Sequence, residues 1–203
     1  MIMTAFILST EADLPIAIAC RKHMTALGWT AKIMIDPNQW ETLPADVVHA
    51  NYGTPERRMT GNDCAMGILD GLIANTTGDE TIMRMDCDVW LSAEASAWFQ
   101  TADNGRAMKI DHHKVQVWGG CWSATRSQIV EARFAAESLK KCRCAESYLN
   151  LMALHYSGGL QTRDELVAQW KPGQSRGIAA TLPIANYQNR AADGLALFDT
   201  ADN

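Results

Sequence analysis

Short apolar runs alternate with longer segments of helical periodicity along most of this sequence. Runs at 2–8 and 30–35 predict buried strands, and a shorter strand is expected at 46–50. Residues 14–27 predict a helix that Gly28 ends, and Ser9 or Thr10 is expected to cap its start. The chain therefore begins as strand, helix and strand.

The same alternation continues through the centre of the chain. Further elements are predicted there: a helix at 62–74, a strand at 82–85, a helix at 93–100, strands at 107–110 and 115–118, and a helix at 126–140. Strands and helices in alternation are typical of an α/β protein, in which a mostly parallel sheet is covered by helices on both faces.

Polar residues follow the predicted strands closely. In an open α/β sheet, ligands bind at the carboxyl ends of the strands. The residues expected at these ends are Thr10, Glu11, Asp36, Asp86 and Asp88. Side chains alternate along a strand, so Asp86 and Asp88 are expected to point to the same side.

Two carboxylates in such proximity repel each other, and burial disfavours their charged forms unless a cation compensates. Oxygen-only ligands suit Mg²⁺ or Mn²⁺, which proteins commonly hold through one or two carboxylates together with substrate phosphates. The simpler alternative is a surface pair that precedes a helix capped near Ser92.

Composition narrows the function classes. The 203 residues are 47% hydrophobic and 20% charged, which suits one packed domain, and the net charge of -5 without a basic block argues against nucleic-acid binding. No apolar run is long enough to span a bilayer and no signal peptide is recognised, so a cytoplasmic location is expected. The six cysteines form no C-x-x-C unit, so reduced thiols are expected.

One stretch resembles a known family. "GNDCAMGILDGLIANTTGDETIMRMDCDVWLS" resembles the central part of GT-A glycosyltransferases, which ends in a D-x-D motif. "FILSTEAD" and "IMIDPNQW" look like the first two strands of that fold, "VQVWGGCWSATR" resembles its Gly-containing acceptor segment, and "HYSGG" resembles its C-terminal His motif. The resemblance implies one Rossmann-like GT-A domain over 1–160, with 161–203 as an extension packed on it.

The sequence departs from the family pattern at two points. Arg84 places a charge within a strand that the family usually makes apolar. The "WKPG" segment at 170–173 also follows "HYSGG" at a longer distance than in families where a Lys-Pro-Trp run comes at once.

The resemblance implies roles for individual residues. Asp86, Asp88 and His155 would bind Mn²⁺ or Mg²⁺, which bridges the phosphates of a nucleotide diphosphate sugar, with a UDP-sugar favoured. The residues implied in nucleotide binding are Thr10, Glu11, Asp36, Arg58 and Asn62. The residues implied near the acceptor and the transferred sugar are Trp90, Gly119, Gly120 and Trp122.

The catalytic base has two candidates, Glu146 and Asp111. Glu146 resembles the first acid of the family's Glu-Asp motif, although Ser147 replaces the second. Residues nine apart on one straight helix lie about half a revolution out of phase, so Glu146 and His155 can share a site only if the helix ends between them.

The sequence therefore predicts a metal-dependent transferase that moves a hexose from a nucleotide diphosphate sugar to a hydroxyl of a glycan, lipid or small acceptor. A non-catalytic nucleotide-binding or sugar-binding domain of the same fold is the first alternative. "IMRMDCDVWL" also fits the motif of aspartyl phosphatases, in which the first Asp is the nucleophile, but no clear acidic pair follows it.

Overall fold

The computed structural model describes most of the first 137 residues and three later strands. The described ranges are 2–52, 61–101, 105–109, 117–137, 161–163, 167–169 and 184–186. Within these ranges, no helix combines the length and apolar character needed to cross a membrane.

A seven-stranded sheet forms the centre of the protein, in the order β3-β2-β1-β4-β7-β6-β8. Its strands are β1 (Met3–Leu8), β2 (Thr30–Ile35), β3 (Val47–His49), β4 (Thr81–Asp86), β6 (Arg106–Lys109), β7 (Val117–Thr125) and β8 (Gln161–Arg163). Strand β7 pairs antiparallel with β4 and β6, whereas the other neighbouring pairs are parallel. The prediction of a mostly parallel sheet is confirmed.

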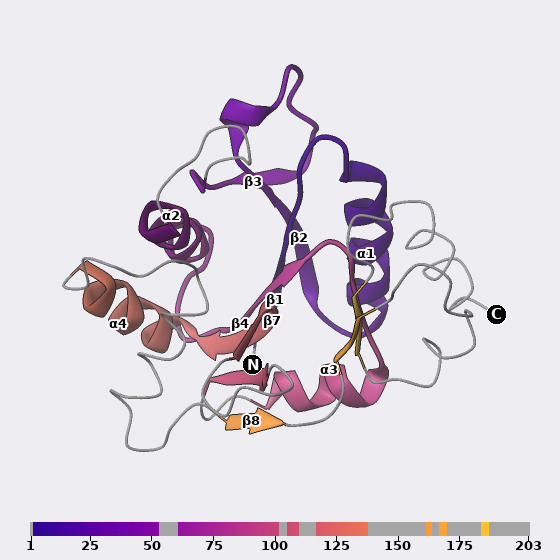
Figure 1. The fold of residues 1–203 in the computed structure, drawn as a ribbon, viewed down its shortest axis with the longest axis vertical. Coiled ribbons are helices and arrows are strands. Elements are labelled where there is room, and N and C mark those ends of the chain that lie inside the picture. The colour runs from indigo at the N-terminus through magenta and orange to yellow at the C-terminus, as the bar shows by residue number, and fades with distance from the viewer. Residues whose placement is uncertain are drawn as a thin grey trace.

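Helices cover both faces of this sheet, as predicted (Figure 1). They are α1 (Leu14–Ala26), α2 (Gly61–Ala74), α3 (Ala93–Gln100) and α4 (Arg126–Glu137), with a short 3₁₀ helix η1 (Pro37–Gln39) after β2. Helices α1 and α3 lie on one side and α2 and α4 on the other. Each face has its own buried apolar cluster, so the sheet separates two cores.

A second, three-stranded sheet includes strands from late in the chain. Strand β5 (Val89–Leu91) pairs antiparallel with β10 (Ile184–Asn186), which pairs parallel with β9 (Val167–Gln169). Strand β8 pairs with β6 in the main sheet. The part of the chain beyond residue 160 thus adds strands to both sheets.

Most predicted boundaries agree with the structure to within one residue, but the strand predicted at 115–118 and the predicted cap of α1 do not. The strand predicted at 115–118 is the start of β7, which continues to Thr125 because it pairs with β4 on one side and β6 on the other. The predicted cap of α1 was also wrong. Asp13 occupies the N-cap position, and the Thr10 hydroxyl instead donates a hydrogen bond of 2.6 Å to the Asp13 carboxylate.

Helix α2 packs very closely on the segment that follows β3. A Cβ atom at Gly67 would lie 1.7 Å from the carbonyl oxygen of Asn51, and one at Gly71 would lie 2.3 Å from the Ala50 Cβ. Only residues without a side chain allow this approach. The two glycines thereby fix the position of the segment that carries Tyr52.

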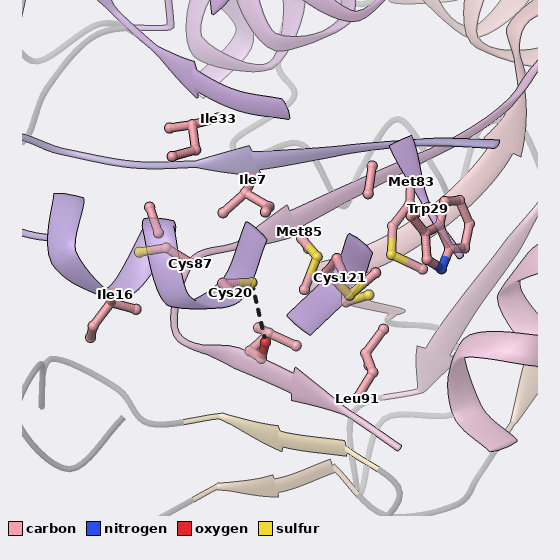
Figure 2. Close-up of a cluster of buried hydrophobic side chains, with 14 of the residues drawn as sticks. Ile7, Ile16, Cys20, Trp29, Ile33, Met83, Met85, Cys87, Leu91 and Cys121 are labelled. Carbon is pink, nitrogen blue, oxygen red and sulfur yellow. Dashed lines mark hydrogen bonds between the residues drawn. The ribbon is translucent and has the colours of Figure 1, made fainter. Parts of the chain in front are cut away.

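The core between the sheet and α1 contains three buried thiols, from Cys20, Cys87 and Cys121 (Figure 2). The Cys20 thiol donates to the Val89 carbonyl oxygen at 3.8 Å. Burial raises the pKa of each of these thiols well above its usual value. The four cysteines that the structure describes form no disulfide with one another, and their expected reduced state remains a prediction.

Candidate active site

The carboxyl ends of three adjacent parallel strands meet at one edge of the sheet. Leu8 of β1 is in register with Met34 of β2 on one side and with Asp86 of β4 on the other. Ser9 follows β1 directly and Asp36 follows β2. Polar groups that lie far apart in sequence are therefore neighbours at this edge, where ligands bind in open α/β sheets.

Tyr52 ties two of these strand ends together. Its hydroxyl lies 3.0 Å from the Ser9 carbonyl oxygen and 3.1 Å from the Met34 carbonyl oxygen, and donates its proton between them. Burial raises the pKa of Tyr52 well above its usual value, and the charge of Asp36 adds to the rise, so the hydroxyl stays protonated. Sequence reasoning missed this residue, although an aromatic side chain two residues after a predicted strand was a visible signal.

The Asp36 carboxylate is hydrogen-bonded within the turn that follows β2. It accepts hydrogen bonds from the Asn38 backbone nitrogen at 3.0 Å and from the Asn38 side-chain amide at 2.9 Å. The residue is 1% exposed and caps η1. Its expected contact with a nucleotide remains a prediction, whereas its role in the turn is directly visible.

The end of β1 contributes Thr10, Glu11 and Asp13. Thr10 is partly buried and bonded to Asp13, while Glu11 is exposed at the surface. The sequence assigned the first two to the nucleotide, which stays a prediction. Asp13, which it did not single out, lies close enough to Asp88 for its charge to raise the pKa of that carboxyl.

Arg84 and Asp86 form an ion pair at the end of β4. The Arg84 guanidinium lies 2.8 Å from the Asp86 carboxylate, and the two residues share one side of the strand because they are two positions apart. The Arg84 side chain is 10% exposed and the Asp86 side chain 40% exposed. This contact supplies the partner that the sequence alone could not identify for Arg84.

Asp88 lies in an environment that disfavours its charge. Residues 87 and 88 form the turn between β4 and β5, so strict alternation extends only as far as Asp86. Loss of solvent around the half-buried carboxyl raises the pKa of Asp88 to about 6, and the charge of Asp86 contributes next. The Arg84 charge opposes this rise but does not cancel it.

This donor set fits a divalent cation that keeps places for other ligands. Asp86 and Asp88 provide hard carboxylate oxygens, and their mutual repulsion is a cost that a bound cation would remove. Within the described part of the chain, no group of three or more His, Cys, Asp or Glu residues is arranged to hold a metal alone. The remaining ligands of Mg²⁺ or Mn²⁺ would have to be water, substrate phosphates or other parts of the chain.

The residues expected near the sugar have different positions. Trp90 is partly buried in β5, where its ring stacks on His23 at a centroid distance of 5.5 Å. Trp122 is 1% exposed and belongs to the core beneath α2 and α4. A side chain this deeply buried cannot stack on a sugar, so the predicted acceptor contact of Trp122 was wrong.

The two glycines of the same segment lie in β7. Cys121 is in register with Met85 of β4, so Gly120 and Gly119 continue along β7 toward the edge where β4 ends. This placement brings their backbone toward the same edge of the sheet as the end of β4. Their contact with a sugar remains a prediction.

Several predicted site residues are not available for comparison. Asn62 lies in the first turn of α2, but only its backbone is described. The residues outside the described ranges are Arg58, Asp111, Glu146 and His155.

This α/β sheet, with helices on both faces, has the fold of GT-A glycosyltransferases. Similar solved structures agree. One is a glycosyltransferase involved in glycosylation of the major capsid of PBCV-1, at TM-score 0.57 and 6% identity, covering 98% of this chain and 100% of that one. Another is the galactosyltransferase LgtC in complex with donor and acceptor sugar analogs, at TM-score 0.55 and 10% identity, covering 98% and 94%.

A third similar structure is larger than this chain. The glycosyltransferase GlyE of Streptococcus pneumoniae TIGR4 matches at TM-score 0.53 and 12% identity over 93% of this chain, which corresponds to 55% of GlyE. No protein-family model matches the sequence, and no curated protein matches it either. At such identities the likeness establishes the fold, and the activity must be argued from the residues at the site.

Proposed function

We propose that this protein is a metal-dependent glycosyltransferase that transfers a hexose from a nucleotide diphosphate sugar to a hydroxyl group of an acceptor. The observation that carries the proposal is the pair Asp86 and Asp88 at the end of β4, whose negative charges are only partly compensated by Arg84. A fold shared with glycosyltransferases supports this choice of reaction, and a metal site built from two carboxylates suits a diphosphate.

Asp86 and Asp88 would hold Mn²⁺ or Mg²⁺ together with the two phosphates of the donor. The cation would act as a Lewis acid and stabilise negative charge on the departing diphosphate. The chain itself orients the carboxylates: Arg84 holds Asp86, and the buried Cys87 fixes the turn that carries Asp88. This preorganisation reduces the reorganisation needed when the donor binds.

The nucleotide would lie along the ends of β1 and β2. Thr10 and Glu11 are proposed to contact it directly, and Tyr52 keeps the two strand ends at a fixed separation. Asp36 would contribute a direct contact or, through η1, the shape of the pocket. Arg58 and Asn62 are proposed for the phosphates, because arginine suits bidentate phosphate contacts and helix N-termini favour anions.

The donor is proposed to be a UDP-sugar and the acceptor a glycan or another hydroxyl compound. The LgtC structure with donor and acceptor sugar analogs supports a two-substrate arrangement on this fold. Glu146 and Asp111 are the proposed bases for the acceptor hydroxyl. Trp90, Gly119 and Gly120 are proposed to line the space for the sugars.

A direct test is thermal unfolding with Mn²⁺ and a panel of nucleotide diphosphate sugars. A ligand that binds only the folded state raises the melting temperature. We expect a metal-dependent rise for one donor in the native protein, no rise in Asp88→Asn, and an unchanged rise in Asp79→Asn. Asp79 is a matched control because it is an exposed aspartate just before β4 begins, at the opposite edge of the sheet.

Turnover separates the alternatives. Transfer to an acceptor, or slow donor hydrolysis without one, would support the transferase. Donor binding without either reaction would identify a binding domain. Hydrolysis of phosphate monoesters without donor binding would favour the aspartyl phosphatase, in which Asp86 would be the nucleophile.

A further inference from the structure

Arg84 occupies an unusual position for a charged residue. It lies within β4, in register with Phe6 of β1 and Trp122 of β7, and both of these neighbours are buried and apolar. Ile82, two residues earlier on the same side of the strand, belongs to the core beneath α2 and α4. An apolar residue would suit this position better if packing were the only requirement.

Burying a guanidinium in such surroundings is costly unless the charge is paired. Arg84 meets this requirement through Asp86, at 2.8 Å. Its partner is one of the two carboxylates proposed to hold the metal, and it is 40% exposed at the edge where ligands bind. The pair thus has one member, Arg84, in the interior of the protein and the other, Asp86, at the proposed metal site.

The pair changes the charge that an incoming cation meets. Asp86, Asp88 and the nearby Asp13 would present several negative charges to a cation, and the Arg84 guanidinium beside Asp86 offsets one of them. A divalent cation is therefore attracted less strongly by the protein alone. The diphosphate of a donor would supply the missing negative charge.

We infer that Arg84 is a positioning residue that makes metal binding depend on the donor: it holds Asp86 and weakens the site for a metal alone, so that metal and nucleotide diphosphate bind together. This inference rests on the proposed function. It distinguishes the protein from a site in which a metal is resident before the donor arrives.

The test is the affinity of the metal-free protein for Mn²⁺ without any donor, followed through the electron paramagnetic resonance signal of unbound Mn²⁺. We expect weak binding by the native protein and binding about tenfold tighter in Arg84→Met, because the variant lacks the positive charge that repels the cation. Arg84→Lys keeps the charge and should behave like the native protein. Asp86→Asn combined with Arg84→Met should remove the gain.

Folding of each variant is checked by circular dichroism, and Arg84→Gln replaces Arg84→Met if the latter does not fold. Equal or weaker Mn²⁺ binding in the uncharged variants would overturn the inference. If the native protein nevertheless binds Mn²⁺ with a nucleotide diphosphate sugar, the proposed function survives that result. If neither the native protein nor any variant binds Mn²⁺, with or without the donor panel, both ideas fail.

Discussion

The ends of β2 and β4 both carry aspartates at the same edge of the sheet, yet the two regions differ in how their charges are satisfied. Asp36 is 1% exposed and accepts two hydrogen bonds from Asn38 within its own turn. Asp86 is instead paired with Arg84, while loss of solvent and then the charge of Asp86 raise the pKa of Asp88 to about 6.

The difference separates a carboxylate that stabilises the fold from a pair that costs stability. Hydrogen bonds to Asp36 are local and complete a 3₁₀ turn. A backbone hydrogen bond and the Arg84 charge favour the charged form of Asp88, but loss of solvent and the charge of Asp86 outweigh them, so its charge is disfavoured in the folded protein. Proteins accept such costs mainly at functional sites, which is why the end of β4 is the stronger candidate.

The largest expected effect is on transfer. Asp88→Asn should lower the transfer rate by about 10² to 10³-fold, since a Lewis-acid metal contributes several kcal/mol to stabilising the transition state. The measurement is the rate of transfer at saturating Mn²⁺ and donor. Asp79→Asn should retain the native rate. Full activity in Asp88→Asn would mean that the Asp88 carboxylate is not needed for transfer, so the end of β4 would no longer be a stronger candidate than the end of β2.

The second largest expected effect is a loss of stability when the close packing of α2 on the segment after β3 is disturbed. Gly67→Ala should lower the free energy of unfolding by about 2 to 3 kcal/mol, because overpacking forces the backbone at Asn51 to move. Denaturant unfolding measures this loss. Asp70→Ala, on the exposed side of the same helix, should change stability by less than about 1 kcal/mol, since it removes only a surface ion pair with Arg133. Equal losses in both variants would contradict the packing argument.

The cost of Asp88 should depend on pH. In the unfolded chain an aspartate has a pKa near 3.9, so between this value and about 6 the folded protein holds a proton that the unfolded chain has released. Stability therefore falls as pH rises through this window. Without divalent metal, Asp88→Asn should be more stable than the native protein by about 2 kcal/mol at pH 7.

The same advantage should become much smaller near pH 4, where Asp88 is protonated in the folded protein and about half protonated in the unfolded chain. Thermal or denaturant unfolding in chelator at a series of pH values gives the comparison. A gain of the same size at pH 4 and pH 7 would mean that the buried charge is not its source.

The smallest expected effect is at Asp36. Asp36→Ala should lower the free energy of unfolding by about 1 kcal/mol through loss of the cap, while Asp36→Asn should be close to native because asparagine caps equally well. Donor affinity is measured in parallel. If Asp36→Asn lowered that affinity strongly without a loss of stability, Asp36 would be a ligand contact and the two strand ends would share one role.

Periodicity predicted most of the elements because each depends on local sequence. Strand β2 and helix α3 match their predicted ranges, and helix α2 begins one residue earlier than expected. Strand β7 was predicted too short because the buried pairing that extends it to Thr125 involves two distant strands. Motif and spacing located Asp86 and Asp88 but did not indicate that Arg84 pairs with Asp86.

Tyr52 shows the same limit at the site. Its role depends on the carbonyl groups of Ser9 and Met34, which only the assembled sheet brings within reach of one hydroxyl. The prediction for Trp122 was wrong for a related reason, because it placed at the site a side chain that the assembled sheet buries. The resemblance of "VQVWGGCWSATR" to an acceptor segment implied a sugar contact for Trp122, whereas pairing of β7 with β4 and β6 places the indole in the core.

The three buried thiols, from Cys20, Cys87 and Cys121, can serve as probes of local unfolding. Cys87 separates the two aspartates in sequence, and Cys121 lies on the adjacent strand. Because these thiols are enclosed and hard to ionise, an alkylating reagent would reach them only when the surrounding structure opens. Mass spectrometry of alkylated peptides would then report how often the end of β4 opens compared with its neighbouring strand. Ligands that stabilise the site should slow the labelling of Cys87 first.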